Sequence, residues 1–177
     1  EGGPNVDGTP GNDLTTQSLL FNTFAAVNSV ITSTALNGLL NAPVTLEAKN
    51  TITVQNTATV ISGASSLTLK AGGDISIAGN ITASGGISLL ANDAGGTPTG
   101  TGKVVLTANL NAGSNTLNIS GAGTHSIGGD LSAGILTVTG NLTLAGAGAR
   151  RVSLSSDSTI SSVIDGAVGL TKAGIGT

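Results

Sequence analysis

The stretch "LTLKAGGDISIAGNITASGGISLLAN", residues 67–92, alternates apolar and small polar side chains, breaks at paired glycines and then starts again. In a β-strand, residues two apart share a face, so Leu67, Leu69 and Ala71 lie on one face. Ile75 and Ile77 repeat the pattern, and the positions between these residues are polar: Thr68, Lys70 and Ser76. The stretch therefore predicts short strands with one buried face and one solvent-facing face.

Similar strands begin at Val44, Leu67, Ile87, Val104 and Leu117, at steps of 23, 20, 17 and 13 residues. Repeats of this length indicate stacked architectures in which each unit covers the apolar face of its neighbour. The glycine-rich corners between strands are too short for crossover helices, so each strand pairs with the equivalent strand of the next turn. We predict an all-β fold, a right-handed parallel β-helix (β-solenoid) with about 20 residues per turn and two or three strands in each. About seven turns would make a rod on the order of 35 Å long.

The composition fits a thin solenoid core and excludes several classes of protein. Of the 177 residues 38% are hydrophobic, but the aromatic residues are only Phe21 and Phe24, and Cys is absent. Charged residues make up 8%, against about 25% in ordinary domains, which also argues against a charge-rich disordered chain. The net charge of −3 argues against nucleic acid as a partner. Without Cys there is neither a disulfide nor a thiolate metal site, and no apolar run is long enough for a membrane span.

Three regions are expected along the chain. Residues 1–13 form an irregular N-terminal arm, residues 14–43 an irregular entry segment, and residues 44–177 the solenoid. A short helix is expected near residues 33–42, with Ser33 as its N-cap. Residues 92–103, rich in Gly, Thr and Pro, are expected to project from the coil. The phrases "GGDIS" from Gly72 and "GGDLS" from Gly128 are interpreted as equivalent corners.

Two sets of motifs resemble known families. The string "ITSTALNGLLNAPVTLEAKNTITVQNTATV" from Ile31, followed by residues 67–92, resembles the repeats of large bacterial exoproteins of the filamentous haemagglutinin type. "VIDGAVGLTKAGIGT" from Val163 is similar to the strand repeats of autotransporter passengers. The resemblance implies a right-handed β-helix, export through an outer-membrane β-barrel partner, and a role in adhesion at the cell surface.

The families also carry an amino-terminal secretion domain with an Asn-Pro motif, for which this sequence has no counterpart. We therefore expect a stalk segment of a longer, extracellular or surface-attached parent chain, rather than a secretion signal. Its expected outside partner is a host or neighbouring cell surface or matrix. Glu1 in place of an initiator Met also fits a mature or excised segment.

Residues that could carry chemistry are few. His125 is the single histidine and has no Cys or second His with which to bind zinc or copper; we interpret it as an exposed corner residue. A polysaccharide-cleaving enzyme would need clustered carboxylates, commonly with aromatic platforms for sugar rings. Trp and Tyr are absent. The aspartates are scattered over several repeats, at Asp74, Asp93, Asp130, Asp157 and Asp165. We expect no catalytic, cofactor-binding or metal-binding residues, and no enzyme activity.

Four weaker signals have structural interpretations. Asn5, Asp7, Asn12 and Asp13 could supply oxygens for a calcium loop, but ordinary turn chemistry is the favoured interpretation of residues 5–13. Arg150 and Arg151 are expected at a solvated corner or edge, and Glu47, Lys49 and Lys70 in a surface charge ladder. Three Asn-X-Ser/Thr acceptor patterns begin at Asn80, Asn118 and Asn141; chance is sufficient to explain them in so Asn- and Thr-rich a chain.

These observations favour a structural function, a stiff stalk of a secreted or cell-surface adhesin. A self-assembling filament joined end to end through strand edges is the alternative. An ice- or polysaccharide-binding solenoid is less favoured, because the threonines do not recur in one fixed column.

Overall fold

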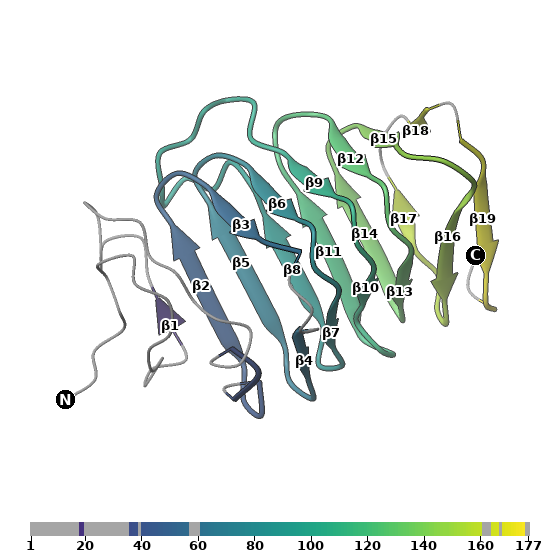
Figure 1. Ribbon diagram of the computed structural model, residues 1–177, viewed down its shortest axis with the longest axis horizontal. Coiled ribbons are helices and arrows are strands. Elements are labelled where there is room, and N and C mark those ends of the chain that lie inside the picture. The colour runs from purple at the N-terminus through teal and green to yellow at the C-terminus, as the bar shows by residue number, and fades with distance from the viewer. Residues whose placement is uncertain are drawn as a thin grey trace.

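The computed structural model describes residues 18–19, 36–38, 40–56, 61–160, 164–166 and 168–175. In these residues the chain is a parallel β-solenoid of about six turns with about 21 residues per turn. Figure 1 shows the strands stacked side by side from the N-terminal end to the C-terminal end. The predicted all-β solenoid is confirmed, with six turns rather than seven. Of the expected helix, residues 36–38 are helical, and Ser33 lies outside the described residues.

Each turn contributes one strand to each of three parallel sheets. The first sheet contains β1 (Ser18–Leu19), β2 (Val44–Ala48), β5 (Leu67–Ala71), β8 (Ile87–Leu90), β11 (Thr116–Ser120), β14 (Ile135–Thr139) and β17 (Thr159–Ile160). The second contains β3 (Ile52–Val54), β6 (Ile75–Ile77), β9 (Val104–Leu106), β12 (His125–Ile127), β15 (Leu142–Leu144) and β18 (Ile164–Asp165). The third contains β4 (Ile61–Gly63), β7 (Ile81–Ala83), β10 (Leu110–Asn111), β13 (Leu131–Ala133), β16 (Arg150–Leu154) and β19 (Leu170–Ala173). Turn 1 is β2 to β4, and turn 6 is β17 to β19.

The core is a set of aliphatic columns that run along the axis. In the first sheet Val44 pairs with Leu67, and Leu67 with Ile87. All three side chains are buried, as are Leu69, Ala71, Ile75 and Ile77, which confirms the predicted inside face. Because each side chain packs on its equivalent in the next turn, small aliphatic residues fill the core without aromatic rings.

The position of Val104 corrects the predicted repeat. Val104 pairs with Ile75 in the second sheet, whereas the equivalent of Ile87 is Leu117, 30 residues later in the first sheet. The 17-residue step from Ile87 to Val104 is therefore not a turn. Both strands read as an apolar residue alternating with a small one, so the pattern alone did not distinguish the sheets.

The phrases at Gly72 and Gly128 are not equivalent corners, which is a second correction. Asp74 precedes β6 in the second sheet, and Asp130 precedes β13 in the third. The repeated unit is instead the nine-residue word ISIAGNITA (75–83), which recurs as VVLTANLNA (104–112) and HSIGGDLSA (125–133). Pairing of Ile81 with Leu110, and of Leu110 with Leu131, places the three copies on top of one another.

Residues 92–103 lie back on the coil rather than projecting from it. The backbone N–H of Thr97 donates to the Lys49 carbonyl at 2.8 Å, and that of Thr99 to the Gly72 carbonyl at 3.2 Å. On the other side, the Gly102 carbonyl accepts from the N–H of Ala122 at 3.0 Å. The insertion therefore binds corners of turns 1, 2 and 4, because its backbone groups find partners there that a projecting loop would lack.

The N-terminal end of the core is covered by residues from the entry segment. Leu36 is 5% exposed and Leu40 1% exposed, and the Leu40 carbonyl accepts from the N–H of Ser65 at 3.0 Å. Strand β1, inside the segment expected to be irregular, pairs in parallel with β2. These contacts close the first turn.

Candidate functional site

Four places in the described part of the chain hold polar or charged groups that bear on function: the outer face of the first sheet, the corners, the interior at His125, and the last turn. Among these residues, no three His, Asp or Glu side chains gather so that they could hold a metal ion. No helix in the described ranges has the length and apolarity needed to cross a membrane. Residues 5–13, the calcium-loop candidate, lie outside the described residues.

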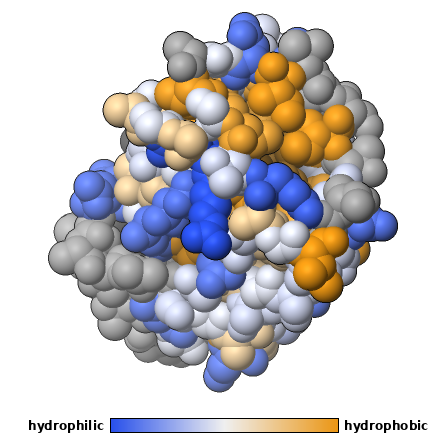
Figure 2. Space-filling view, turned by 90° about the vertical axis from the view of Figure 1, so that its right-hand side faces the viewer, coloured by the Kyte–Doolittle hydropathy of each residue, from blue (hydrophilic) through white to orange (hydrophobic). Residues whose placement is uncertain are grey.

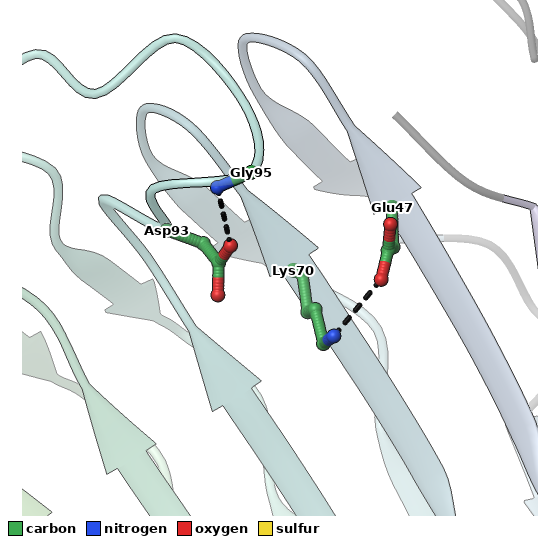
Figure 3. Close-up of polar contacts among 4 residues, drawn as sticks. All are labelled: Glu47, Lys70, Asp93 and Gly95. Atoms are coloured by element: carbon green, nitrogen blue, oxygen red, sulfur yellow. Dashed lines mark hydrogen bonds and ion pairs between the residues drawn. The ribbon is translucent and has the colours of Figure 1, made fainter. Parts of the chain in front are cut away.

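One ion pair links turns 1 and 2 on the outer face of the first sheet. Glu47 and Lys70 are in register, and Lys70 Nζ lies 2.9 Å from Glu47 Oε1, as Figure 3 shows. The hydrogen bond that Lys70 donates to Glu47 raises the pKa of Lys70 above its ordinary value. Burial opposes the shift, and the charges of Glu47 and Asp93 add to it. The predicted charge ladder is confirmed for this pair. Asp93 instead accepts the N–H of Gly95 at 2.9 Å, and Lys49 is exposed beyond the end of β2.

The corner between the second and third sheets carries a ladder of side-chain oxygens. Asn80 Oδ1 accepts the N–H of Asn109 at 2.9 Å, and Asn109 Oδ1 accepts the N–H of Asp130 at 2.8 Å. Asp130 Oδ1 then accepts the N–H of Arg151 at 3.0 Å. Each side chain supplies the acceptor that a corner amide of the next turn needs.

The aspartates therefore do not converge on a catalytic centre. At another corner Asp74 Oδ1 accepts the N–H of Lys103 at 3.0 Å, and Asp165 Oδ1 accepts the N–H of Gly166 at 2.7 Å. These carboxylates bind backbone amides in separate turns. Most glycoside hydrolases place two carboxylates on either side of one bond, whereas Asp74, Asp93, Asp130 and Asp165 each bind a backbone amide and belong to four different turns.

Arg150 is not a solvated corner residue, although Arg151 is exposed. The Arg150 guanidinium donates to the Gly128 carbonyl at 2.6 Å and to the carbonyls of Ala147 and Gly148. Its Nε is the one buried side-chain nitrogen or oxygen in the described ranges that lacks a hydrogen-bond partner. The guanidinium thus ties two corners together, a role that adjacent arginines in a sequence do not reveal.

The outer face of the first sheet carries a column of hydroxyl and amide side chains. Thr45, Thr68, Ser88, Asn118 and Thr137 follow one another in register. Ser88 and Asn118 interrupt the threonines, as the sequence analysis expected, so the face lacks the uniform threonine array of a lattice-binding surface. Of the acceptor-pattern asparagines, Asn141 is exposed at a corner, Asn118 lies in this column, and Asn80 belongs to the corner ladder.

His125 is buried, which corrects its interpretation as an exposed corner residue. Its side chain is 0% exposed and is the one buried polar side chain in the described part of the chain. It occupies the column of the second sheet between Val104 and Leu142. The sequence did contain a sign of this burial, because His125 occupies the position that Ile75 and Val104 occupy in the other copies of the nine-residue repeat.

The C-terminal end of the core is open. Ile164 is 40% exposed, Leu170 42% and Ile175 89%, and Figure 2, which looks onto this end, shows orange side chains around a blue centre. A cavity of about 230 Å³ lies among aliphatic side chains of the last three turns, with Arg150 and Lys172 in its lining. Lys172 pairs with Val152 and so continues a column that is aliphatic in earlier turns. The sequence predicts unpaired strand edges at the ends of the coil. It does not predict that aliphatic side chains are buried at the first turn and partly exposed at the last.

No protein-family model, no curated protein and no solved structure matches this chain.

Proposed function

We propose that this chain is a stiff stalk segment of a secreted or cell-surface bacterial adhesin, with reach and rigidity as its contribution. The observation that carries the proposal is the continuous pairing of three sheets through six turns. Such stacking resists bending, because bending would stretch ladder hydrogen bonds on at least one sheet at every turn. Among the described residues, Asn80, Asn109 and Asp130 also accept backbone N–H groups of the next turn.

The adhesin assignment is supported by the resemblance of the repeats to haemagglutinin-type exoproteins and autotransporter passengers. It carries with it an outer-membrane β-barrel export partner, an extracellular location, and a host or neighbouring cell surface or matrix as the target of the parent chain. No enzymatic role is proposed, since the described carboxylates are dispersed over separate corners.

A stalk tolerates the loss of one whole turn, whereas a binding site in that turn does not. Leu67 and Ile87 are in register, so deletion of residues 67–86 removes one turn and keeps every column aligned. We expect this variant to fold, to be about 4.8 Å shorter by small-angle scattering, and to support attachment when produced in the parent chain. Deletion of residues 67–76 breaks the register and should abolish folding. Loss of attachment with the fold intact would contradict the stalk proposal.

A second candidate function is end-to-end self-association, favoured by the exposed aliphatic side chains Ile164 and Leu170 of the last described turn. Unpaired strand edges over an apolar surface are templates for further strands. Analytical ultracentrifugation should show assembly that grows with concentration, and Ile164→Glu and Leu170→Glu should each remove it. A wild-type chain that stays monomeric at all concentrations would contradict this candidate and leave the stalk unaffected.

A further inference from the structure

The His125 side chain completes a backbone ladder that turns 1, 2 and 4 of the same column complete with a carbonyl. The N–H of Ile52 donates to the Asp74 carbonyl at 3.1 Å, and the N–H of Ile75 to the Lys103 carbonyl at 2.9 Å. At the next step the N–H of Val104 donates to His125 Nδ1 at 3.0 Å. The ring therefore replaces a backbone acceptor between turns 3 and 4.

The other ring nitrogen reaches turn 5. His125 Nε2 lies 2.9 Å from the Thr139 carbonyl oxygen, which can only accept, while the Val104 amide can only donate. These two partners require a bare Nδ1 and a proton on Nε2, the neutral form of imidazole. Through this form His125 joins turns 3, 4 and 5.

The surroundings leave the ring no alternative position. A Cβ at Gly121 would lie 3.0 Å from His125 Cε1, and one at Gly140 would lie 2.9 Å from Nε2. Gly140 also has a φ of +107°, a region that favours glycine. The glycines on either side thus give the ring a close-fitting slot at the corner.

Few charged groups border this slot. Strands β12 and β15 carry no charged residue, and next to β9 stands Lys103, whose N–H binds the Asp74 carboxylate. In the preceding turn of the corner, Asp93 Oδ1 is bound to the N–H of Gly95. No ion pair to the ring occurs in the described ranges, so nothing there offsets a positive charge on the imidazole.

We propose that His125 is an acid-sensitive latch of the solenoid, which holds turns 3 to 5 together when neutral and releases them when it gains a second proton. A proton on Nδ1 would point at the Val104 N–H, so the latch bond breaks and a donor is left buried without an acceptor. The unfolded or locally opened chain takes up the proton freely in water. Stability is therefore expected to fall on acidification, because the opened chain binds the second proton without losing the bond between Val104 and His125.

The latch is tested by comparing wild type with His125→Leu, which matches Leu142 in the same column and cannot be protonated. Urea unfolding measured at pH 7.5 and pH 5.5 should show a loss in the wild-type folding equilibrium constant of up to about tenfold per pH unit. His125→Leu should lack this part of the pH dependence. The control His125→Leu/Ser126→His moves the histidine to the outer face and should behave as His125→Leu does. Equal pH dependence in wild type and His125→Leu would overturn the proposal.

A second measurement needs no variant, because the chain contains one histidine. Nitrogen-15 NMR of the wild-type ring at pH 7.5 should show a bare Nδ1 and a protonated Nε2. On acidification, the second proton should arrive together with loss of hydrogen-exchange protection at the Val104 amide. A ring that becomes doubly protonated while the Val104 amide stays protected would overturn the latch, as would the opposite tautomer at pH 7.5.

Discussion

Turns 2 and 6 of the solenoid contain nearly the same short sequence motif, which is buried in turn 2 and partly exposed in turn 6. Turn 2 contains LTLKA (67–71) and turn 6 contains LTKA (170–173), yet Leu67 is 1% exposed and Leu170 is 42% exposed. Ile75 and Ile164 belong to one column, and their exposed fractions are 0% and 40%. The difference teaches that burial in this fold is supplied by the neighbouring turns on both sides, as in other repeat proteins.

The largest effect is expected from a charge placed in the core of turn 2. Leu69→Asp or Ile77→Asp buries an unpaired carboxylate in an aliphatic column, and should cost more than about 4 kcal/mol or abolish folding. Ile164→Asp in turn 6, at the column position of Ile75, leaves its carboxylate largely in water and should cost less than about 1 kcal/mol. Circular dichroism during urea unfolding measures both. Similar losses in the two turns would break the comparison.

A cavity should show the same contrast at smaller amplitude. Leu117 is 0% exposed, so Leu117→Ala should lower the free energy of unfolding by about 2–5 kcal/mol. Leu170→Ala removes a side chain that is already partly in water, and should cost about 1 kcal/mol or less. Thermal and urea unfolding of the two variants, with wild type as reference, provide the test. An equal cost would mean that the end of the rod is covered in solution.

The corner ladder sharpens the comparison, because it depends on the next turn in the same way as the core. Asp130→Ala leaves the Arg151 N–H without its acceptor and should cost about 1–2 kcal/mol. Asp130→Asn reproduces the residue found at Asn80 and Asn109, and should stay within about 0.5 kcal/mol of wild type. Exchange of the Arg151 amide proton should accelerate in the alanine variant alone. Equal stability and equal exchange of the Arg151 amide proton in the two variants would show that the corner ladder does not contribute to stability.

The smallest effect is expected on the outer face. Glu47→Gln removes the charged partner of Lys70 and should cost about 1 kcal/mol or less, since ion pairs at a protein surface contribute little. The pKa of Lys70 is raised in the folded chain, so the stabilisation is fully present below the ordinary lysine pKa and is lost as the pH rises through the folded value. Unfolding measured at pH 8 and at about pH 11 should show that the difference in stability between wild type and variant is smaller at the higher pH. A cost that persists there would point to packing by the Glu47 stem.

The alternation of residues in 67–92 was sufficient to predict the strand type, the inside face and the stacked architecture. This succeeds because the period of two in a strand and the near-constant repeat length are properties of the chain alone. The pairing of Glu47 with Lys70 was also predictable, since equivalent positions of successive turns lie side by side in a solenoid. Aligning the strands by their short sequence motifs assigned Val104 to the wrong sheet. The insertion at residues 92–103 changes the spacing between strands, and the motifs of different sheets are similar.

The sequence by itself determined a thin aliphatic core, the small corners and the solenoid class, since each follows from local alternation and from the lack of large side chains. The register between turns, and therefore which side chains cover one another, is visible only in the tertiary structure. The tertiary structure placed His125 inside a column, folded residues 92–103 back onto the coil, and turned the Arg150 guanidinium toward backbone carbonyls. The physical reason is that burial and hydrogen-bond satisfaction are properties of pairs of turns, and a pair exists only once the register between them is set.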